Sequence, residues 1–497
     1  MLRRRKNLRE IMSKPFYITT TLPYVNAEPH IGFAMEIVRA DAIARYHGLL
    51  GEGVFFNTGT DEHGQKLFDK AKAEGKDVKK YVDEYAEKFR ELAPLLGISE
   101  NVHFIRTTDS HHESAAQELW KRCYENGYIE KRNYQAKYCV GCELEKTDSE
   151  LVEGRCPVHP DRELELINEE NYFFLLSKIA PKIEKLFEDK KDFVIPDFRF
   201  NEMKALLSRG LQDFSISRLK SKMSWGVPVP GDEDHVMYVW FDALTNYIST
   251  LGWPEDKNGE YKKFWEEGTK VQYCGKDNIR QQSVMWQGML LAAGLPTTDH
   301  IVINGFINSG GQKMSKSLGN VLSPFEIIEE YKSVAGDLAS DVLRYYLLRH
   351  VNSFEDSDVT KETIKEYYNA GLANGLGNLT SRILTLSEKY LENIPEIPEN
   401  SIPQEFFNYL ENFDVQKACD FVWSKIQSLD EKIQKEEPFK VVKVDLEKGK
   451  EIISELVLEL YTITRMLNPI MPETNKYLKA QIKLNKKPEK PLFLRLD

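Results

Sequence analysis

The N-terminal part of the chain alternates between β-rich and helical runs, and this alternation constrains the fold more than any other feature of the sequence. A β-rich run at 16–24 precedes a helical pattern at 30–51, and a second β-rich run follows at 53–64. Apolar residues of the helical segment recur every three or four positions, as on one face of a helix: Ile31, Met35, Val38, Ala42 and Tyr46. The order strand, helix, strand predicts an α/β fold with a doubly wound, parallel, Rossmann-like sheet. Ligands of such sheets bind at the carboxyl ends of the strands, which here hold residues 23–32 and 58–64.

Changes of pattern along the chain predict several structural units. A length of 497 residues is too great for one ordinary core. Residues 15–116 and 224–320 are expected to form two halves of the sheet domain, with residues 117–223 as an insertion between them. Apolar residues spaced by three and four predict a long helix at 363–390, and residues 356–497 as a whole are expected to form an α-helical bundle.

Residues 1–14 are expected to be a flexible tail outside these units. The first ten residues are basic but lack the apolar core of a secretory signal. A short transit-like arm and an upstream start ahead of Met12 are alternatives, since a strand-like run begins soon after that methionine.

Charge and composition exclude some classes of protein. The net charge of −11 argues against indiscriminate nucleic-acid binding over the whole surface, but it does not exclude a local basic track. No apolar run reaches the roughly 18 residues of a transmembrane helix, so no membrane partner is expected. Six cysteines in a chain of this length do not form a disulfide framework, and Cys123, Cys274 and Cys419 are expected to be buried thiols. These features fit a reducing cytoplasm.

Four residues have the spacing of a structural zinc site. Cys139 and Cys142 form a C-x-x-C pair, and after thirteen further residues Cys156 and His159 form a C-x-x-H pair. Thiolate and imidazole are the usual ligands of tetrahedral Zn²⁺. Because four protein ligands leave no position for water or substrate, the zinc is expected to be structural.

Two further motifs suit a ligand that carries phosphate. His30 lies where a strand gives way to a helix, and the amides at a helix N-terminus bind phosphate. The segment GGQKMSKSLGN, residues 310–320, places two lysines and two serines between glycines that let the backbone move. Taken singly, each has an ordinary structural explanation, a packed or capping histidine and a solvated loop. Neither a Walker loop nor an intact GxGxxG motif occurs, so a P-loop or dinucleotide site is not expected.

Taken together, the two motifs resemble the HIGH and KMSKS motifs of class I aminoacyl-tRNA synthetases. The first reads HIGF, so Phe33 stands where the family has its second histidine, whereas KMSKS at residues 313–317 is intact. Blocks along nearly the whole chain resemble the methionyl-tRNA synthetase family, in its subgroup with a single zinc knuckle: TTTLPYVNAEPHIG, FFNTGTDEHGQK, NYFFLLSK, SISR with WGVPVPG, YVWFDALTNY, GKDN and GQKMSKSLGN.

The resemblance implies site residues for the two small substrates. The ATP-binding residues would be His30, Gly32, Gly275, Asp277, Lys313, Ser315 and Lys316. Of these, His30, Lys313 and Lys316 are the expected catalytic residues, because they would stabilise the phosphates. The methionine-binding residues would be Leu22, Tyr24, Asp61, Arg218, Trp240, Ala243, Tyr247 and Gln282. Asp61 is the expected counter-ion of the substrate ammonium group, and aromatic walls suit a polarizable thioether. Gln282 departs from the family, which has a histidine there.

The resemblance also implies a tRNA-binding role for the C-terminal part. Residues 321–355 would be a linker that contacts the tRNA stem, and residues 356–497 would bind the anticodon. The anticodon-reading residues would be Asn378, Arg382 and Phe439, the last in place of the family's tryptophan.

The implied activity has two steps. ATP and L-methionine would give methionyl-adenylate, and the methionyl group would then pass to the 3′ end of methionine tRNA, both initiator and elongator. Mg²⁺ would accompany ATP, and one structural Zn²⁺ would be bound. The protein would be cytoplasmic. It would also be a monomer, since the sequence ends where the family core ends.

Two alternatives stay open from the sequence. A synthetase for another apolar amino acid is disfavoured because the chain lacks the large editing insertion of the isoleucine, leucine and valine enzymes. A non-catalytic tRNA-binding paralogue is suggested by Phe33 and Gln282, but the intact KMSKS segment, Asp61 and the zinc knuckle argue against it.

Overall fold

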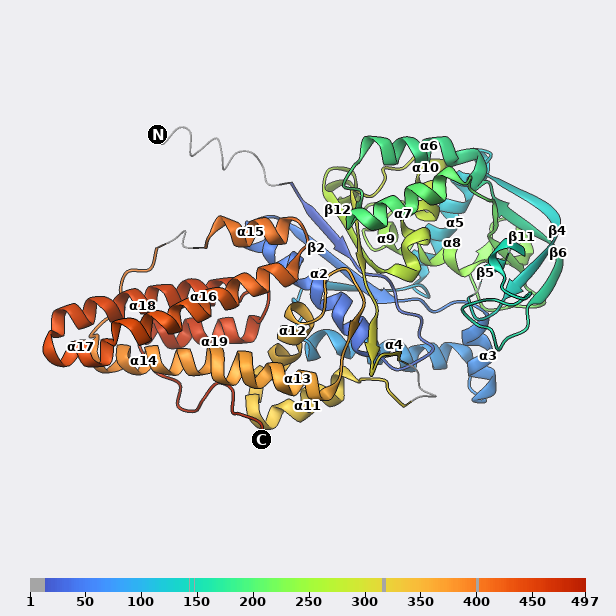
Figure 1. The fold of residues 1–497 in the computed structure, drawn as a ribbon. Coiled ribbons are helices and arrows are strands. Elements are labelled where there is room, and N and C mark those ends of the chain that lie inside the picture. Colours follow the sequence, from blue (N-terminus) through green and yellow to red (C-terminus); the bar gives the residue numbers. More distant parts are fainter. Residues whose placement is uncertain (1–13, 143, 147, 315–318, 399–401) are drawn as a thin grey trace, which may run out of the picture.

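The computed structural model describes residues 14–142, 144–146, 148–314, 319–398 and 402–497. It consists of an α/β body around a parallel sheet and a long helical bundle that projects from the body (Figure 1). The predicted tail at 1–14 lies outside the described residues, apart from Lys14.

A six-stranded parallel sheet forms the centre of the body, as the sequence predicts. The strand order is β3-β2-β1-β12-β13-β7, and every neighbouring pair is parallel. The strands are β1 (Phe16–Thr19), β2 (Val54–Thr60), β3 (Val102–Arg106), β7 (Val194–Ile195), β12 (Thr269–Gly275) and β13 (His300–Asn304). The direction of progression reverses between β1 and β12, and open α/β sheets bind ligands at such a switch point.

Side chains of the strands alternate between two cores, one on each face of the sheet. In β1, Phe16 and Ile18 join one core and Tyr17 joins the other. The helices of these cores are α2 (Ile31–Leu49) and α12 (Ala339–Arg349) on the first face, and α5 (Ser110–Glu125), α6 (Leu176–Asp189) and α10 (Trp286–Ala292) on the second.

Helix α2 differs from the one-faced helix that its sequence suggests. The apolar stripe is buried as expected, but so are Glu36, Arg39 and Asp41 on its other faces. Arg39 donates to backbone carbonyls of residues 351–353 at 2.7–3.0 Å, and Asp41 pairs with Arg344 of α12 at 2.8 Å. The helix is charged and yet enclosed, because the segments after the sheet cover its outer side.

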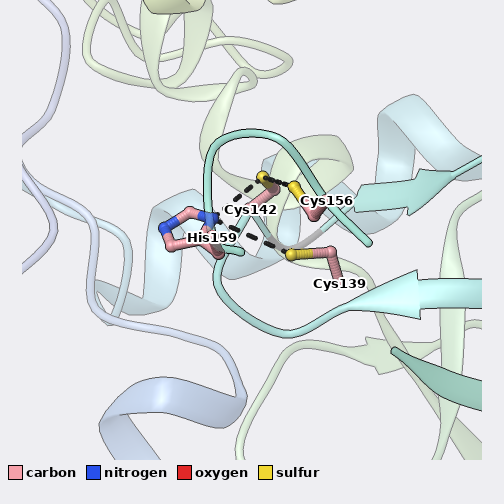
Figure 2. Close-up of side chains that lie close together, drawn as sticks. All are labelled: Cys139, Cys142, Cys156 and His159. Carbon is pink, nitrogen blue, oxygen red and sulfur yellow. Dashed lines mark hydrogen bonds between the residues drawn. The ribbon is translucent and has the colours of Figure 1, made fainter. Parts of the chain in front are cut away.

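The insertion contains a four-stranded antiparallel sheet of order β5-β4-β6-β8. Its strands are β4 (Ile129–Cys139), β5 (Leu144–Lys146), β6 (Glu165–Phe174) and β8 (Phe214–Ser215). The Cys/His cluster begins at the last residue of β4 (Figure 2). Not all of the range 117–223 stays in the insertion, because β7 returns to pair with β13 at the edge of the main sheet.

Further helices and short strands complete the α/β body and the insertion. They are α3 (Gln65–Ala73), α4 (Val78–Leu95), α7 (Asp197–Ser208), β9 (Ser217–Leu219), β10 (Pro228–Val229), β11 (Asp232–Met237), α8 (Val239–Ala243), α9 (Asn246–Ser249), β14 (Ile307–Ser309), β15 (Gln312–Lys313), α11 (Pro324–Ala335) and β16 (Ser357–Asp358).

The C-terminal part is helical, as predicted. Its helices are α13 (Lys361–Tyr367), α14 (Asn378–Tyr390), α15 (Gln404–Glu411), α16 (Val415–Glu436), α17 (Pro438–Val444), α18 (Leu446–Met466) and α19 (Pro472–Lys483). A wide π-helical stretch, Tyr368–Gly377, joins α13 to α14, so the predicted long helix is continuous but not uniform. Gly371 lies in this stretch, and a Cβ atom there would come within 1.9 Å of the Tyr345 hydroxyl.

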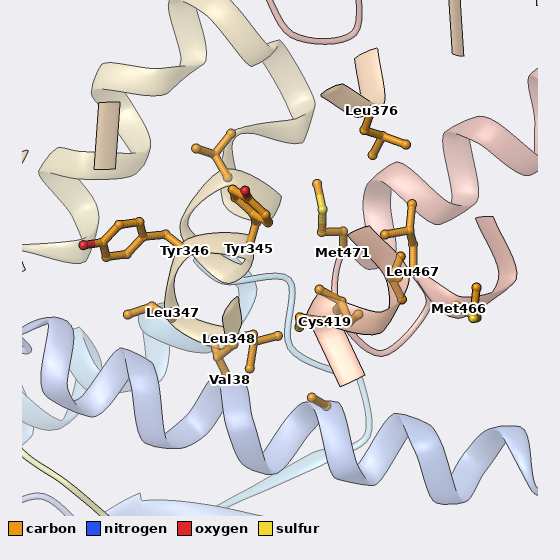
Figure 3. Close-up of a cluster of buried hydrophobic side chains, with 14 of the residues drawn as sticks. Val38, Tyr345, Tyr346, Leu347, Leu348, Leu376, Cys419, Met466, Leu467 and Met471 are labelled. Atoms are coloured by element: carbon orange, nitrogen blue, oxygen red, sulfur yellow. The ribbon is translucent and has the colours of Figure 1, made fainter. Parts of the chain in front are cut away.

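The bundle and the α/β body share one core. Figure 3 shows Val38 of α2 and Tyr345 and Leu348 of α12 in the same cluster as Leu376, Cys419 and Met471 of the bundle. The bundle is therefore packed directly against α2, the helix that His30 caps. Among the helices of the described residues, none is long and apolar enough to cross a bilayer.

Candidate active site and metal centre

His30 forms the N-terminal cap of α2, at the carboxyl end of β1. Its backbone is extended, and its Nδ1 atom accepts a hydrogen bond from the Gly32 amide at 3.0 Å. Because Nδ1 accepts, the ring proton is placed on Nε2, the nitrogen that can donate to a phosphate oxygen. A side chain at position 32 would put Cβ within 2.8–2.9 Å of the imidazole, so the glycine of the motif is needed for this capping geometry.

Backbone hydrogen bonds join the two predicted ATP motifs. The Ile31 amide donates to the Leu322 carbonyl at 3.0 Å, just beyond the KMSKS segment. Before that segment, β15 pairs with β14, and the Gly311 amide donates to Asp358 at 2.8 Å. Residues 315–318 and the side chain of Lys313 lie outside what the structure describes, so the expected phosphate contacts of Lys313, Ser315 and Lys316 stay predictions.

Phe33 packs among aromatic rings at the position where the family has its second histidine. Its ring meets that of Phe89 in α4 edge-to-face at 5.4 Å and lies 4.5 Å from the His30 ring. Phe104 of β3 belongs to the same apolar cluster. An imidazole at position 33 would place polar nitrogens against these aromatic rings.

Asp61 and Tyr24 are brought together at the ends of β2 and β1. The Asp61 amide donates to the Pro23 carbonyl at 3.0 Å, and the Asp61 carbonyl accepts from the Val25 amide at 3.2 Å. Asp61 is only 6% exposed. Gly64 follows in the same loop, and a Cβ there would lie 2.3 Å from the Tyr24 hydroxyl, so the loop passes close to that ring.

Further residues predicted to bind methionine come from other segments of the chain. Trp240 and Ala243 lie in α8 and Tyr247 lies in α9. The Gln282 amide donates to the Tyr247 hydroxyl at 2.6 Å, and both side chains are almost fully buried. Gln282 therefore keeps a hydrogen bond at the position where the family has a histidine. Leu22 is half-buried next to β1.

Arg218 lines a cavity of about 280 Å³ between the insertion, the start of α3 and the start of α8. Its guanidinium group is 4.4 Å from the ring of Tyr238 and 5.1 Å from the ring of Tyr138. Gly64 and Val239 also line this cavity, so Arg218 shares it with the Asp61 loop and with α8.

Two further residues predicted to bind ATP, Gly275 and Asp277, lie at the carboxyl end of β12. Gly275 ends this strand, and a Cβ there would approach the Asp277 carboxylate to 2.7 Å. The buried Glu36 of α2 accepts a hydrogen bond from the Thr21 amide at 2.7 Å. Burial raises the pKa of Glu36 to about 7; hydrogen bonds from Thr21 oppose the rise and the charge of Asp277 adds to it.

The four predicted metal ligands converge on one point (Figure 2). Cys142 Sγ lies 3.2 Å from His159 Nδ1 and 3.4 Å from Cys156 Sγ, and Cys139 Sγ lies 3.8 Å from His159 Nδ1. Tetrahedral Zn²⁺ with Zn–S bonds of about 2.3 Å separates its ligand atoms by about 3.5–3.8 Å, so the donor set fits this ion. A Cβ at Gly141 would lie 2.5 Å from the His159 ring, which requires glycine between the first two cysteines.

One hydrogen bond connects the metal centre to the active-site region. Lys66 of α3 donates to the Gly141 carbonyl at 2.8 Å. Because α3 begins directly after Gly64, this hydrogen bond links the loop of the Cys/His cluster to the segment that carries Asp61.

The predicted anticodon residues lie in the bundle, away from the sheet (Figure 1). Asn378 is exposed at the start of α14, and Arg382 on the same helix forms an ion pair with Asp430 of α16. Phe439 is 40% exposed in α17, at the outer end of the bundle.

Comparisons with known proteins decide the family. A family model described as tRNA synthetases class I (M) matches residues 16–165 and 158–384. A methionine–tRNA ligase of a Nostoc strain is 38% identical over 96% of this chain and 91% of its own, and one of Thermotoga maritima is 37% identical over 96% and 76%. The chain belongs to the methionyl family of class I tRNA synthetases. A solved structure of the Mycobacterium tuberculosis methionyl-tRNA synthetase with methionyl-adenylate matches with a TM-score of 0.87 and 32% identity, over 97% of this chain and 99% of the other.

Membership of the methionyl family confirms the predicted resemblance and the Rossmann-like fold class. The structure also shows buried polar residues that the sequence did not single out, namely Glu36, His63 and Asp242. Burial of Glu36 could have been predicted, because it is a charged residue within an apolar helical pattern. His63 and Asp242 are in contact although 179 residues separate them, so local pattern carried no sign of the pair.

Proposed function

We propose that this methionyl-family synthetase joins L-methionine to its tRNA at the expense of ATP, with the residues assigned below. The observation that carries the function is the match over 97% of the chain to a structure that holds methionyl-adenylate. The positions matching the family's substrate residues gather at the carboxyl ends of β1 and β2 and in the adjoining helices, which supports the same conclusion.

In the first step the methionine carboxylate attacks the α-phosphorus of ATP, and the bond from that phosphorus to pyrophosphate breaks. The substrate is itself the nucleophile, so the protein contributes position and charge rather than a nucleophile or base. His30 would donate from Nε2, and Lys313 and Lys316 would stabilise the separating pyrophosphate. Mg²⁺, expected with ATP, would neutralise phosphate charge.

Methionine would lie between Asp61 and the aromatic residues of α8 and α9. The Asp61 carboxylate would bind the substrate ammonium group, with Arg218 at the same polar end. Trp240 and Tyr247 would pack on the thioether, whose polarizable sulfur favours aromatic contacts. The hydrogen bond from Gln282 holds the Tyr247 hydroxyl in place.

In the second step a hydroxyl of the terminal tRNA ribose attacks the activated carbonyl, and AMP leaves. Asn378, Arg382 and Phe439 would bind the anticodon of initiator and elongator methionine tRNA, because exposed rings stack on bases and polar side chains read base edges. We further propose that the protein is a cytoplasmic monomer; the buried, free thiols of Cys123, Cys274 and Cys419 support a reducing compartment.

Amino-acid-dependent ATP–pyrophosphate exchange across the twenty amino acids tests the substrate. Methionine alone should support rapid exchange. A different preferred amino acid would reassign the substrate. If the wild-type protein shows no exchange and Phe33→His restores it, the protein is a non-catalytic tRNA-binding paralogue and the proposed activity is wrong.

The zinc assignment has a separate test. Purified protein should contain one zinc per chain, held by Cys139, Cys142, Cys156 and His159, where the ion would fix the loop structure without taking part in the chemistry. Cys142→Ser should lose the metal, whereas Cys123→Ser, at a buried thiol elsewhere, should keep it. Stoichiometric zinc in Cys142→Ser would contradict the assignment.

A further inference from the structure

The two residues after Asp61 are held by buried charged hydrogen bonds that neither reaction step uses. Glu62, fully buried, accepts from Arg106 at 2.7 and 2.8 Å and from the hydroxyls of Thr60 and Thr108 at 2.6 Å. These bonds fix the loop on the side that faces β3. They do not connect it to the residues expected to bind the methionine side chain.

His63 makes that connection. Its Nδ1 atom lies 2.6 Å from one carboxylate oxygen of Asp242. The other oxygen of Asp242 lies 2.9 Å from Nε2 of His112, and Nδ1 of His112 shares a hydrogen bond of 2.8 Å with the Ser249 hydroxyl. His63, His112, Asp242 and Ser249 are all buried.

The charge state of the pair makes this contact strong. Burial alone would raise the pKa of Asp242, but the charge of His63 and hydrogen bonds from both histidines lower it to about 2. Burial also opposes charge on His63, yet the Asp242 carboxylate raises the pKa of this imidazole above its ordinary value. Charge-assisted hydrogen bonds of this kind are shorter and stronger than neutral ones, and breaking one inside a protein is costly.

The sequence positions of the two partners show what the contact holds together. His63 is two residues from Asp61, in a loop whose backbone is bonded on both sides. Asp242 lies in α8 between Trp240 and Ala243. A hydrogen bond of 2.6 Å thus joins two segments. One is the loop that would bind the ammonium group of methionine, and the other is the helix that would contact the thioether of methionine.

We propose that His63 and Asp242 are positioning residues for methionine, which set the distance between the two ends of its binding site without touching the substrate. This inference rests on the assignment of Asp61 and Trp240 to methionine. His112 bonds the same carboxylate from α5 but is not part of the loop, so it stabilises α8 and α9 without placing Asp61.

Kinetics of methionine-dependent exchange separate positioning from general stability. His63→Leu should raise the KM for methionine by about 10–100-fold, because a misplacement of about 1 Å can cost about 10²-fold, while the KM for ATP stays within about twofold. His112→Leu is the matched control. It removes the other partner of Asp242 and should lower the melting temperature by a similar amount, but should leave the KM for methionine within about threefold.

A conservative pair of variants keeps the test informative if His63→Leu does not fold. The amide nitrogen of asparagine lies where His63 places Nδ1, whereas that of glutamine lies nearer the position of Nε2. His63→Asn should therefore retain a KM for methionine close to wild type, and His63→Gln should not. Equal KM values for these two variants, or equal KM increases in His63→Leu and His112→Leu, would overturn the proposal.

Asp61→Asn distinguishes this inference from the assignment on which it rests. If Asp61→Asn leaves the KM for methionine unchanged, the ammonium site itself is wrongly placed. If Asp61→Asn raises that KM and His63→Leu does not, the ammonium site stands and the positioning role is lost.

Discussion

The proposed methionine site at the Asp61–Gly64 loop and the proposed anticodon site at the outer end of the helical bundle differ in how their side chains are held. Beside Asp61, the charged groups of Glu62 and His63 are buried and hydrogen-bonded, Glu62 to Arg106 and two threonines and His63 to Asp242. At the outer end, Phe439 is 40% exposed. A free amino acid must be distinguished by its own small shape, so its site needs fixed geometry. A tRNA brings large stacking surfaces, and exposed side chains can adapt to them.

This difference predicts the size of mutational effects. Removing one member of a buried charged network leaves the charge of its partner unpaired, and this lowers the free energy of unfolding by several kcal/mol. Exposed ion pairs contribute only about 0–1 kcal/mol to that free energy. Substitutions at the sheet end should therefore have larger effects than those in the bundle. Four predictions test this order, from the largest expected effect to the smallest.

Lys316→Gln should have the largest effect, on the adenylation rate. Its charge is needed most as pyrophosphate separates, and loss of one preorganised donor costs roughly 3–4 kcal/mol, about 10²–10³ in rate. Exchange kinetics at saturating methionine measure this loss, and Lys332→Gln on α11 is the control for removing a lysine charge. Unchanged exchange in Lys316→Gln would remove the KMSKS assignment.

Glu36→Gln should change how stability depends on pH. The pKa of Glu36 is raised from 4.5 to about 7, so between these values the folded state binds more protons than the unfolded state. The contribution of this group to the free energy of unfolding is fully present below pH 4.5 and is lost as pH rises through about 7, a loss of about 3 kcal/mol.

Denaturant unfolding at pH 5.5 and pH 8 measures that contribution. Wild type should lose stability toward pH 8 relative to Glu36→Gln, in which the group stays neutral. Glu329→Gln, at an exposed carboxylate of α11, is the control and should follow wild type. Parallel pH curves for wild type and Glu36→Gln would show that Glu36 titrates normally.

Phe439→Ala should weaken tRNA charging while leaving pyrophosphate exchange intact, because the exchange needs no tRNA. Base–aromatic stacking contributes roughly 1–3 kcal/mol, and a phenyl ring falls at the lower end, so kcat/KM for tRNA should fall by about 5–10-fold. Val444→Ala, at an exposed apolar residue of the same helix, should have little effect, and Phe439→Trp should be tolerated. Equal charging by wild type and Phe439→Ala at subsaturating tRNA would refute the role.

Asp430→Asn should have the smallest effect. Unlike the other substitution in the bundle, it should improve tRNA binding. It releases Arg382 from its ion pair, which makes the guanidinium available to RNA. This pair is partly exposed, and a contribution of about 0.2–1 kcal/mol corresponds to a decrease in the KM for tRNA of about 1.4–5-fold. Arg382→Gln should raise that KM, and a rise in Asp430→Asn as well would indicate that the ion pair holds Arg382 in its binding geometry.

Local pattern in the sequence predicted those features that repeat at short range. Alternating β-rich and helical runs predicted the parallel sheet. The C-x-x-C and C-x-x-H spacings predicted the clustering of three cysteines and a histidine, and the fully buried Cys123, Cys274 and Cys419 agree with the expected thiols. Such features are encoded within a few residues, and so they can be recognised without the fold.

Long-range features were missed for a physical reason. β7 has only two residues, too few for any periodicity, and it is a strand only because β13 pairs with it. Glu36 and Asp41 have the charge of surface residues and are buried because distant segments cover α2. The contact between His63 and Asp242 depends on the packing of a loop against a helix from another part of the chain.

The buried Arg344 bears on how far this protein can be divided. This side chain pairs with Asp41 of α2 and also donates to the carbonyls of Pro469 and Ile470, at 3.0 Å each. A fragment that stopped before residue 356 would keep the ion pair but lose both carbonyls, and it would expose the apolar surface of α12 around Tyr345. The α/β body is therefore not a detachable module, and a minimal adenylating fragment would need substitutions at this contact surface before it could remain folded in isolation.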